Sequence, residues 1–358
     1  DLETWALNSD NTSFEHKTVK WVPGLYKCFD EAIVNARDHY IRMKISKEKK
    51  KHLVKNIEIG CYDGVIEIMN DGNGIDVAMH PKDNLWIPEM IFMHLRTSTN
   101  YDDEEKKLVG GKNGFGIKLV FVFAKWGEIE TVDHVRKLKY TQRVERNLSK
   151  IHKPTIEKYT GKPYTKVRWM PDYEKFGLET MTTDIWSLLR KRAFDVAAVT
   201  DKSLKVKIQG EDIDIKTFEQ YADMYIGDKT ESPRVVQSSD RWECVVGLSP
   251  LDEFSQVSFV NGIYTGKGGK HVDYITNQIC KKMIEYIKKK KKVTVKATTI
   301  KEQLMVFVNC MIENPAFDSQ TKDYMNTPYS KFGSKFEISD KTIDKLAKMG
   351  VMDAAISL

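Results

Sequence analysis

The chain has 358 residues, of which 41% are hydrophobic and 30% are charged, and its formal net charge is +6. This length suffices for two ordinary domains, and no run approaches the ~18 apolar residues of a membrane span, so we expect a globular protein without a membrane partner. Five scattered cysteines without a CxxC pair speak against a zinc site and indicate reduced thiols.

The first predicted element is a helix over residues 24–42, which begins after a Pro-Gly pair. At about 100° per residue, one sector is apolar and should pack on a core; it contains Leu25, Phe29, Ala32, Ile33, Ala36 and Tyr40. The opposite stripe is polar and contains Glu31, Asn35, Asp38 and Arg42. Such a stripe is typical of an ordinary surface helix. It would also suit a site in which Glu31 takes a proton from water and Asn35 offers an oxygen to Mg²⁺.

A basic segment over residues 42–55 follows, for which we favour a solvated loop. Alternating apolar residues on both sides of Asp63-Gly64 predict a β-hairpin over residues 56–69. The next string, "NDGNGI" at 70–75, is either a plain turn or a place where Asp71 accepts a hydrogen bond from a flat ring that the glycines let approach.

The string "GGKNGFGIK" at 110–118 is rich in glycine and lysine and leads into an apolar run that could start a helix. Exposed amides at such a helix start can bind an anion. The string is not a Walker A loop, which requires GxxxxGK followed by Ser or Thr, and it has neither the kinase nor the Rossmann glycine spacing.

Later segments predict strands at "EIETVD", "KYTQRVER" and "YTKVRWMP" and a helix over 184–199, hence a mixed antiparallel sheet with helices. From about residue 231 we expect a smaller α/β domain, with strands at "RWECVVGLS", "QVSFVNGIYT" and "QLMVFVNCMI" and an amphipathic helix "HVDYITNQICKKMIEYIKKK". The predicted class is therefore α+β, with domains 1–230 and 231–358. A run of five lysines lies at the end of this helix, Lys288, Lys289, Lys290, Lys291 and Lys292. For this run we favour contact with a polyanion such as double-stranded DNA over a solvated loop.

Several strings, taken together and in order, resemble the ATPase region of the eukaryotic-type type IIA DNA topoisomerases, members of the GHKL (Bergerat-fold) superfamily. The resemblance covers nearly the whole chain. The strings are "VPGLYKCFDEAIVNARD" (22–38), "NDGNGI" (70–75), "IPEMIFMHLRTSTNYDDEEKK" (87–107), "GGKNGFGIKL" (110–119), "SFVNGIYTGKGGKHVDYIT" (258–276) and "ENPAFDSQTKDYM" (313–325).

The resemblance implies a GHKL ATP-binding domain followed by a transducer domain, and it implies roles for matched residues. Glu31 would be the general base, Asn35 would hold Mg²⁺, and Asp71 would meet the adenine amino group. Ribose and phosphate contacts would come from Ser98, Thr99 and Asn100. The ATP lid would comprise Gly111, Lys112, Asn113, Gly114, Phe115, Gly116, Ile117 and Lys118. From the transducer, Gln320 and Lys322 would reach the γ-phosphate.

Some residues depart from the family pattern. His39 stands next to the phosphates where the family usually has Asn, and Lys112 replaces an Arg that could bind in bidentate fashion. Phe115 and Ile117 are milder variants. A neutral His can still donate one hydrogen bond, so we expect His39 to tune binding rather than to abolish it.

The resemblance implies Mg²⁺-dependent ATP hydrolysis that closes an N-terminal gate, dimerises the chain and supports passage of a DNA strand. DNA cleavage is not expected from this chain, because the cleavage and tyrosine-bearing DNA-binding domains lie elsewhere in the family. The alternatives are a nucleotide-switched DNA clamp that does not hydrolyse ATP, or a GHKL ATPase of chaperone or mismatch-repair type. The family default is a nuclear location, with a viral or cytoplasmic one as the alternative.

Overall fold

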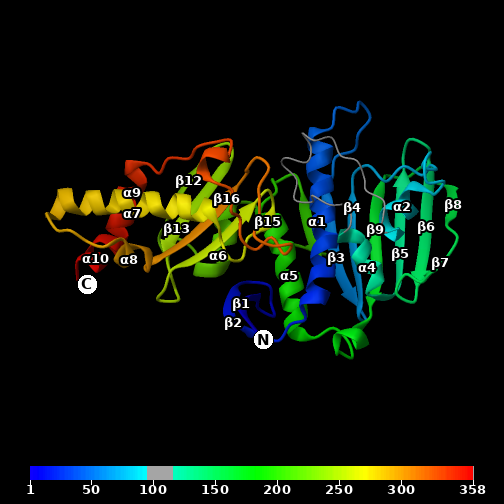
Figure 1. The fold of residues 1–358 in the computed structure, drawn as a ribbon, viewed down its shortest axis with the longest axis horizontal. Coiled ribbons are helices and arrows are strands. Elements are labelled where there is room, and N and C mark those ends of the chain that lie inside the picture. The colour runs from blue at the N-terminus through cyan, green and yellow to red at the C-terminus, as the bar shows by residue number, and fades with distance from the viewer. Residues whose placement is uncertain (95–115, 358) are drawn as a thin grey trace. The chain divides into compact units, whose positions relative to one another are not determined.

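The computed structural model describes residues 1–94 and 116–357. They form two compact units, Asp1–Lys216 and Thr217–Leu358, and Figure 1 labels most of their elements. The division lies earlier in the chain than the expected 230/231. The reason is helix α6 (Phe218–Ile226), which packs its aromatic rings against Phe259 and Phe307 of the second unit. Both units combine helices and strands, and the predicted α+β class is confirmed.

The first unit is built on one large sheet in the order β11-β10-β3-β4-β9-β5-β6-β7, with β8 paired to β6. The predicted hairpin is confirmed as β3 (Asn56–Tyr62) and β4 (Val65–Asp71), and both residues of its turn have positive φ, as a tight hairpin requires. The other strands are β5 (Ala124–Asp133), β6 (Leu138–Glu145), β7 (Lys150–Ile151), β8 (Thr155–Lys158), β9 (Tyr164–Pro171), β10 (Lys205–Ile208) and β11 (Glu211–Asp212). Only β10 and β3 pair in parallel among them.

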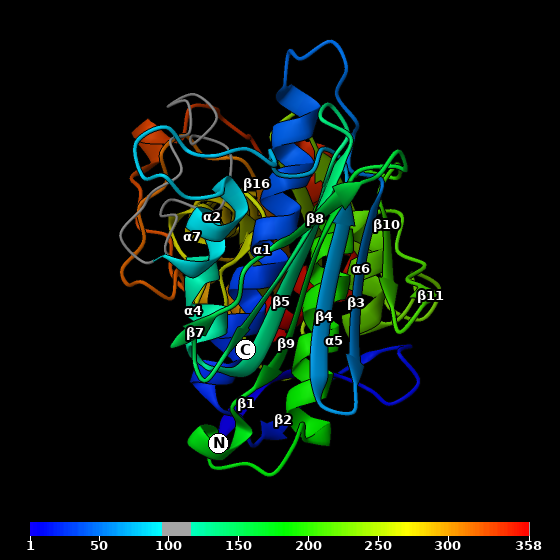
Figure 2. The ribbon, with the colours of Figure 1, turned by 90° about the vertical axis from the view of Figure 1, so that its right-hand side faces the viewer.

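Helices cover one face of this sheet, as Figure 2 shows. They are α1 (Pro23–Ile45), α2 (Ile87–Met93), α4 (Gly116–Val122) and α5 (Thr183–Ala198). Ile66 and Ile68 are buried beneath them, whereas Glu67, which points to the other face, pairs with Lys166 and Arg168. A hairpin of β1 (Leu2–Leu7) and β2 (Phe14–Val19) packs on α5, and a short 3₁₀ turn spans Tyr173–Phe176. One face of the sheet is therefore covered and the other is charged.

The predicted helix over 24–42 is confirmed as α1, and its whole apolar sector is buried. The opposite stripe differs from that of an ordinary surface helix. Asp38 is only 5% exposed, and Glu31, Asn35 and Arg42 are half-buried. The cause is long-range packing, since α4 and α5 both contact α1. A polar stripe that is kept from solvent on a central helix is a candidate functional surface.

The second unit holds a five-stranded sheet in the order β12-β13-β16-β14-β15. Its strands are β12 (Arg234–Ser238), β13 (Trp242–Leu248), β14 (Ser255–Val260), β15 (Ile263–Tyr264) and β16 (Leu304–Cys310). The single strand expected over "QVSFVNGIYT" is two strands, because Asn261 and Gly262 both adopt positive φ and reverse the chain. Within residues 1–94 and 116–357, no helix combines the length and the apolar character needed to cross a membrane.

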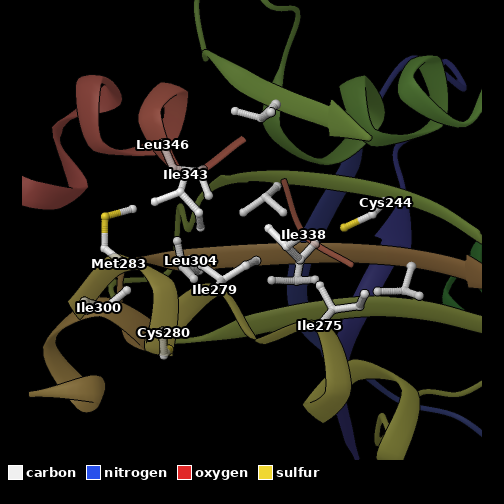
Figure 3. Close-up of a cluster of buried hydrophobic side chains, with 14 of the residues drawn as sticks. Cys244, Ile275, Ile279, Cys280, Met283, Ile300, Leu304, Ile338, Ile343 and Leu346 are labelled. Carbon is white, nitrogen blue, oxygen red and sulfur yellow. The ribbon is translucent and has the colours of Figure 1, made fainter. Parts of the chain in front are cut away.

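Helix α7 (Lys270–Lys291) forms one side of the hydrophobic core of the second unit, and Figure 3 shows part of this core. Its predicted amphipathic character is confirmed, since Ile275, Ile279, Met283 and Ile287 line one side of the helix and are fully buried. The remaining elements are α8 (Ala297–Lys301), a 3₁₀ turn at Tyr329–Lys331, α9 (Asp340–Leu346), a π turn at Ala347–Val351 and α10 (Met352–Ser357).

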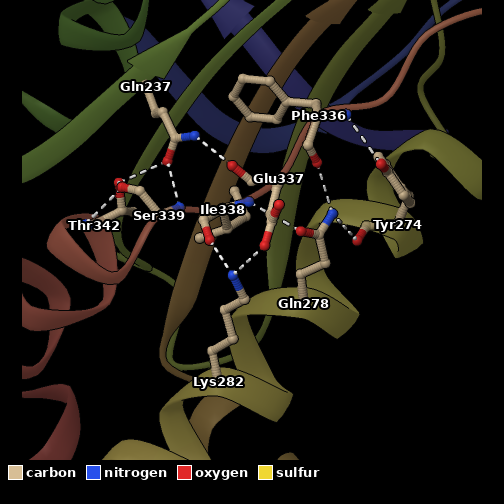
Figure 4. A network of polar contacts seen from close by, with 9 residues as sticks. All are labelled: Gln237, Tyr274, Gln278, Lys282, Phe336, Glu337, Ile338, Ser339 and Thr342. Carbon is tan, nitrogen blue, oxygen red and sulfur yellow. Dashed lines mark hydrogen bonds and ion pairs between the residues drawn. The ribbon is translucent and has the colours of Figure 1, made fainter.

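Two glutamines fasten the irregular segment before α9 to this unit (Figure 4). Gln278 of α7 donates to the carbonyl of Phe336 at 2.9 Å and accepts from the amide of Ile338 at 2.9 Å. Gln237 of β12 donates to the carbonyl of Glu337 at 2.7 Å. Backbone groups that lack a strand or helix partner are thereby satisfied, so the segment holds one conformation without regular secondary structure.

Candidate functional site

Glu31 lies on the half-buried stripe of α1, against the first residue of α4. A Cβ at residue 116 would lie only 1.8 Å from Glu31 Oε2, so the carboxylate fits there because Gly116 has no side chain. Lys27 Nζ, one turn earlier on α1, lies 2.8 Å from Glu31 Oε1. The fold thus brings the acid of the predicted helix to the end of the glycine-rich string, as a shared site requires.

Asn35 follows Glu31 by one helical turn on the same stripe and is half-buried. A carboxylate and an amide supply the hard oxygen ligands that suit Mg²⁺. In the part of the chain that the structure describes, no group of three or more His, Cys, Asp or Glu side chains could hold a metal by itself. Mg²⁺ in proteins usually keeps several waters and binds through one or two protein oxygens together with substrate phosphates, and a single amide such as that of Asn35 is compatible with such a site.

His39 uses both ring nitrogens within the protein. Its Nε2–H donates to the carbonyl of Asn73 at 2.6 Å, and its Nδ1 accepts from Arg42 at 3.3 Å. Burial, with the nearby charge of Arg42, lowers the pKa of His39 to about 4, so the ring is neutral near pH 7. The N–H of His39, which was expected to donate to a phosphate, instead donates to the turn after β4 and so links α1 to this turn.

Asp71 lies on the sheet face that the helices do not cover, together with Glu67 and Met69. Its Oδ1 accepts from the amides of Lys55 and Asn56 at 2.6 and 2.9 Å, and a hollow of about 410 Å³ lies beside it. Successive strand residues point to opposite faces. The structure therefore does not bring Asp71 together with Glu31 and Asn35.

Asn70, one residue earlier, points to the covered face, where it is 6% exposed. It lies opposite Thr165, whose hydroxyl contacts that of Thr131 at 2.8 Å. The turn after β4 lies directly against β5 at Gly74. A Cβ at this residue would lie 1.9 Å from the carbonyl oxygen of Val132, so the close approach requires glycine. Asn70 was not among the predicted site residues, although its even spacing from Ile66 and Ile68 signals the same face.

The remaining residues of the first unit fall into two groups. Ser98, Thr99, Asn100, Gly111, Lys112, Asn113, Gly114 and Phe115 lie outside the described residues. Ile117 and Lys118 belong to α4 and are 7% and 1% exposed. Burial lowers the pKa of Lys118. The helix that begins against Glu31 thus carries a cation that is almost fully removed from water.

The other predicted residues belong to the second unit. Gln320 and Lys322 lie in the loop between β16 and the turn at Tyr329, and Lys322 has a φ of +59°, which is unusual for a side-chain-bearing residue. The lysine run Lys288–Lys292 forms the exposed end of α7, with Lys292 as a left-handed cap. Cations at a helix C-terminus also favour the helix itself.

Comparisons with known proteins agree with this arrangement. The family model of DNA gyrase B matches residues 207–355. DNA topoisomerase 2 of Arabidopsis thaliana is 41% identical over 99% of the chain, and that of Saccharomyces cerevisiae is 40% identical over 96%. The chain spans about a quarter of their length, at 24% and 25%.

A solved structure extends the match to the fold. The ATPase region of Saccharomyces cerevisiae topoisomerase II, bound to ICRF-187, is 38% identical and has a TM-score of 0.90. The alignment covers 100% of this chain and 92% of that one. The chain therefore belongs to the family of type II DNA topoisomerase ATPase regions.

Proposed function

We propose that this chain binds ATP with Mg²⁺, hydrolyses it, and forms the ATP-operated gate of a type II DNA topoisomerase. The observation that carries the proposal is the apposition of Glu31 with Gly116. It joins a carboxylate suited to activating water to the end of a glycine-rich string suited to phosphates. The similarity to topoisomerase II ATPase regions over the whole chain supports the same function and speaks against the chaperone and mismatch-repair alternatives.

Each side chain takes a defined part in this reaction. Glu31 accepts the proton of the water that attacks the γ-phosphorus. Bound Mg²⁺, with Asn35 as its protein ligand, would neutralise negative charge on the phosphates. Lys118 adds a buried positive charge on α4, where electrostatic stabilisation is strong.

The other groups complete the nucleotide site. We propose that Asn70, rather than Asp71, faces the adenine, because it lies on the covered face. The residues Ser98 to Asn100 and Gly111 to Phe115 remain predicted nucleotide contacts. From the second unit, which we propose to be a transducer domain, Lys322 would stabilise charge on the γ-phosphate and Gln320 would orient the attacking water.

We further propose how the chain acts within the whole enzyme. ATP would favour dimerisation because the closed gate binds it better than the open gate. The exposed lysines Lys288–Lys292 would contact the captured duplex, while cleavage would need domains outside this chain. We propose a nuclear location. The alternative of a clamp that does not hydrolyse ATP is favoured by one observation, that both nitrogens of His39 are engaged within the protein.

Steady-state hydrolysis separates these two functions. We expect Mg²⁺-dependent release of phosphate from ATP by the chain, with duplex DNA present and absent. The variant Glu31→Gln should lose turnover and keep its affinity for a non-hydrolysable ATP analogue. The matched control is Glu15→Gln, an exposed carboxylate on β2, which should hydrolyse normally. Analogue binding without any turnover in the unaltered chain would favour the clamp, and wild-type turnover by Glu31→Gln would contradict the proposed base.

A further inference from the structure

The loop that carries Gln320 and Lys322 is fastened by its backbone to the start of α7. The amide of Lys267 donates to the carbonyl of Asp323 at 2.9 Å, and that of Lys270 donates to the carbonyl of Met325 at 2.8 Å. In return, the amide of Met325 donates to the carbonyl of Gly268 at 3.2 Å. These three bonds join two segments that are far apart in the sequence.

The loop itself is closed at its base. The amide of Asp318 donates to the carbonyl of Tyr324 at 3.1 Å, and Asn326 Nδ2 donates to Asp318 Oδ1 at 2.7 Å. At the tip, the amide of Lys322 donates to the carbonyl of Ser319 at 3.1 Å. Because the loop is closed on itself, the position of Lys322 follows the position of the base.

Gly269 permits this attachment. Its φ is +148° with ψ −170°, a region that side-chain-bearing residues rarely enter. A Cβ there would lie 2.4 Å from the carbonyl oxygen and 2.7 Å from the amide nitrogen of Met325. On its other side it would lie 3.0 Å from His271 Cε1. The obstructing Met325 atoms are backbone, so they could give way only if the loop moved.

The His271 ring, which a Cβ at residue 269 would contact, is held within the protein. It is fully buried, and its Nε2 lies 3.0 Å from Thr265 Oγ1. Burial lowers the pKa of His271 to about 3, so the ring stays neutral. Gly269 therefore has a fully buried ring on one side and the base of the loop on the other.

We propose that Gly269 and the amide of Lys270 form a latch that positions Lys322 and Gln320 for phosphoryl transfer. Both are positioning residues, because they act through the loop that carries Lys322 and Gln320. The inference rests on the proposed function, in which Lys322 serves the γ-phosphate. It adds that hydrolysis depends on a backbone contact at the start of α7.

A proline at residue 270 tests the latch with little disturbance. Lys270 is the first residue of α7, where an amide has no partner within the helix and where proline is well tolerated. Lys270→Pro removes the bond to Met325, whereas the matched control Lys270→Ala keeps it. We expect Lys270→Pro to lower kcat by at least ~10-fold, since a shift of about 1 Å can cost ~10²-fold. KM should change less than about threefold, because the loss falls on the transition state.

Glycine substitutions give a second test. Gly269→Ala should lower kcat in the same way. Two controls should not: Gly266→Ala, whose Cβ would meet only Tyr264 at 3.4 Å, and Gly350→Ala, which has a φ of +110° in open space. Thermal unfolding checks each variant, and if Gly269→Ala does not fold, the proline variant decides.

The outcomes separate this proposal from the proposed function. If Lys322→Ala lowers kcat but Lys270→Pro does not, the latch is refuted and the proposed function stands. Equal losses in Lys270→Pro and Lys270→Ala would also refute it, because the side chain would then be responsible. If the unaltered chain releases no phosphate, the proposed function fails and the latch fails with it. If Lys322→Ala keeps the full kcat, the role proposed for Lys322 and the latch both fail, whereas ATP hydrolysis by the chain stands.

Discussion

Replacing Gly116 by alanine should separate the placement of Glu31 from the stability of the fold. The added Cβ would lie 1.8 Å from Glu31 Oε2, whereas an ordinary contact begins at 3.4 Å, so the carboxylate must move by about 1.6 Å. The carboxylate is the end of a flexible side chain and can rotate away. A displacement of about 1 Å can cost ~10²-fold in rate, or ~2.7 kcal/mol in the barrier.

The fold should tolerate the same change. Gly116 is the first residue of α4, and its φ is not positive, so alanine is allowed there and favours a helix by up to ~1 kcal/mol. We therefore expect kcat for ATP hydrolysis to fall ~10²-fold while the midpoint of urea unfolding stays the same or rises.

The assay is phosphate release at saturating ATP, with urea unfolding followed by circular dichroism. The matched control is Gly24→Ala near the start of α1, whose Cβ would meet only the ring of Phe176 at 3.0 Å; it should keep its kcat. Wild-type turnover by a folded Gly116→Ala protein would refute the reasoning, because Glu31 would then not need its present position.

Three further changes test the electrostatics of both units. Asp195→Ala should cost ~3–5 kcal/mol of unfolding free energy in urea, because it removes the carboxylate that lies 3.0 and 2.9 Å from the buried cations of Lys191 and Arg192; a loss below ~1 kcal/mol would contradict this. Below pH ~6.5 the unfolded chain protonates His271 and the folded chain does not, so the free energy of unfolding should fall as the pH falls, by up to ~1.4 kcal/mol per pH unit. If the unfolding free energy of His271→Gln depended on pH as steeply as that of the unaltered chain, this prediction would be contradicted. Replacing Lys288–Lys292 by glutamine should weaken duplex binding and reduce its salt slope by ~0.9 for each phosphate that these lysines neutralise, and an unchanged slope would leave them as a solvated helix end.

The spacing of apolar residues in the sequence predicted those elements whose buried face follows from their own local pattern. The apolar sector of α1 and the buried track of α7 follow from helical spacing, and the β3–β4 hairpin follows from alternation around a turn. The same spacing could not show that the polar stripe of α1 is half-buried. That property depends on α4 and α5, which reach α1 only through long-range packing.

The site shows the same limit. Glu31, Asn35 and the end of the glycine-rich string were predicted to share a site, and the structure brings Glu31 and Gly116 into contact. Asp71 was chosen by its chemical type, although strand alternation already placed Asn70 on the face of Ile66. The bond from His39 to Asn73 joins a helix to a turn, and no local pattern in the sequence encodes it.

A structure of the chain with a non-hydrolysable ATP analogue and Mg²⁺ tests the central claim most directly. We predict that the triphosphate lies beside Glu31, Asn35 and Gly116, with the metal at Asn35 and the adenine beside Asn70. A nucleotide bound instead on the charged face of the sheet, in the hollow beside Asp71, would contradict it.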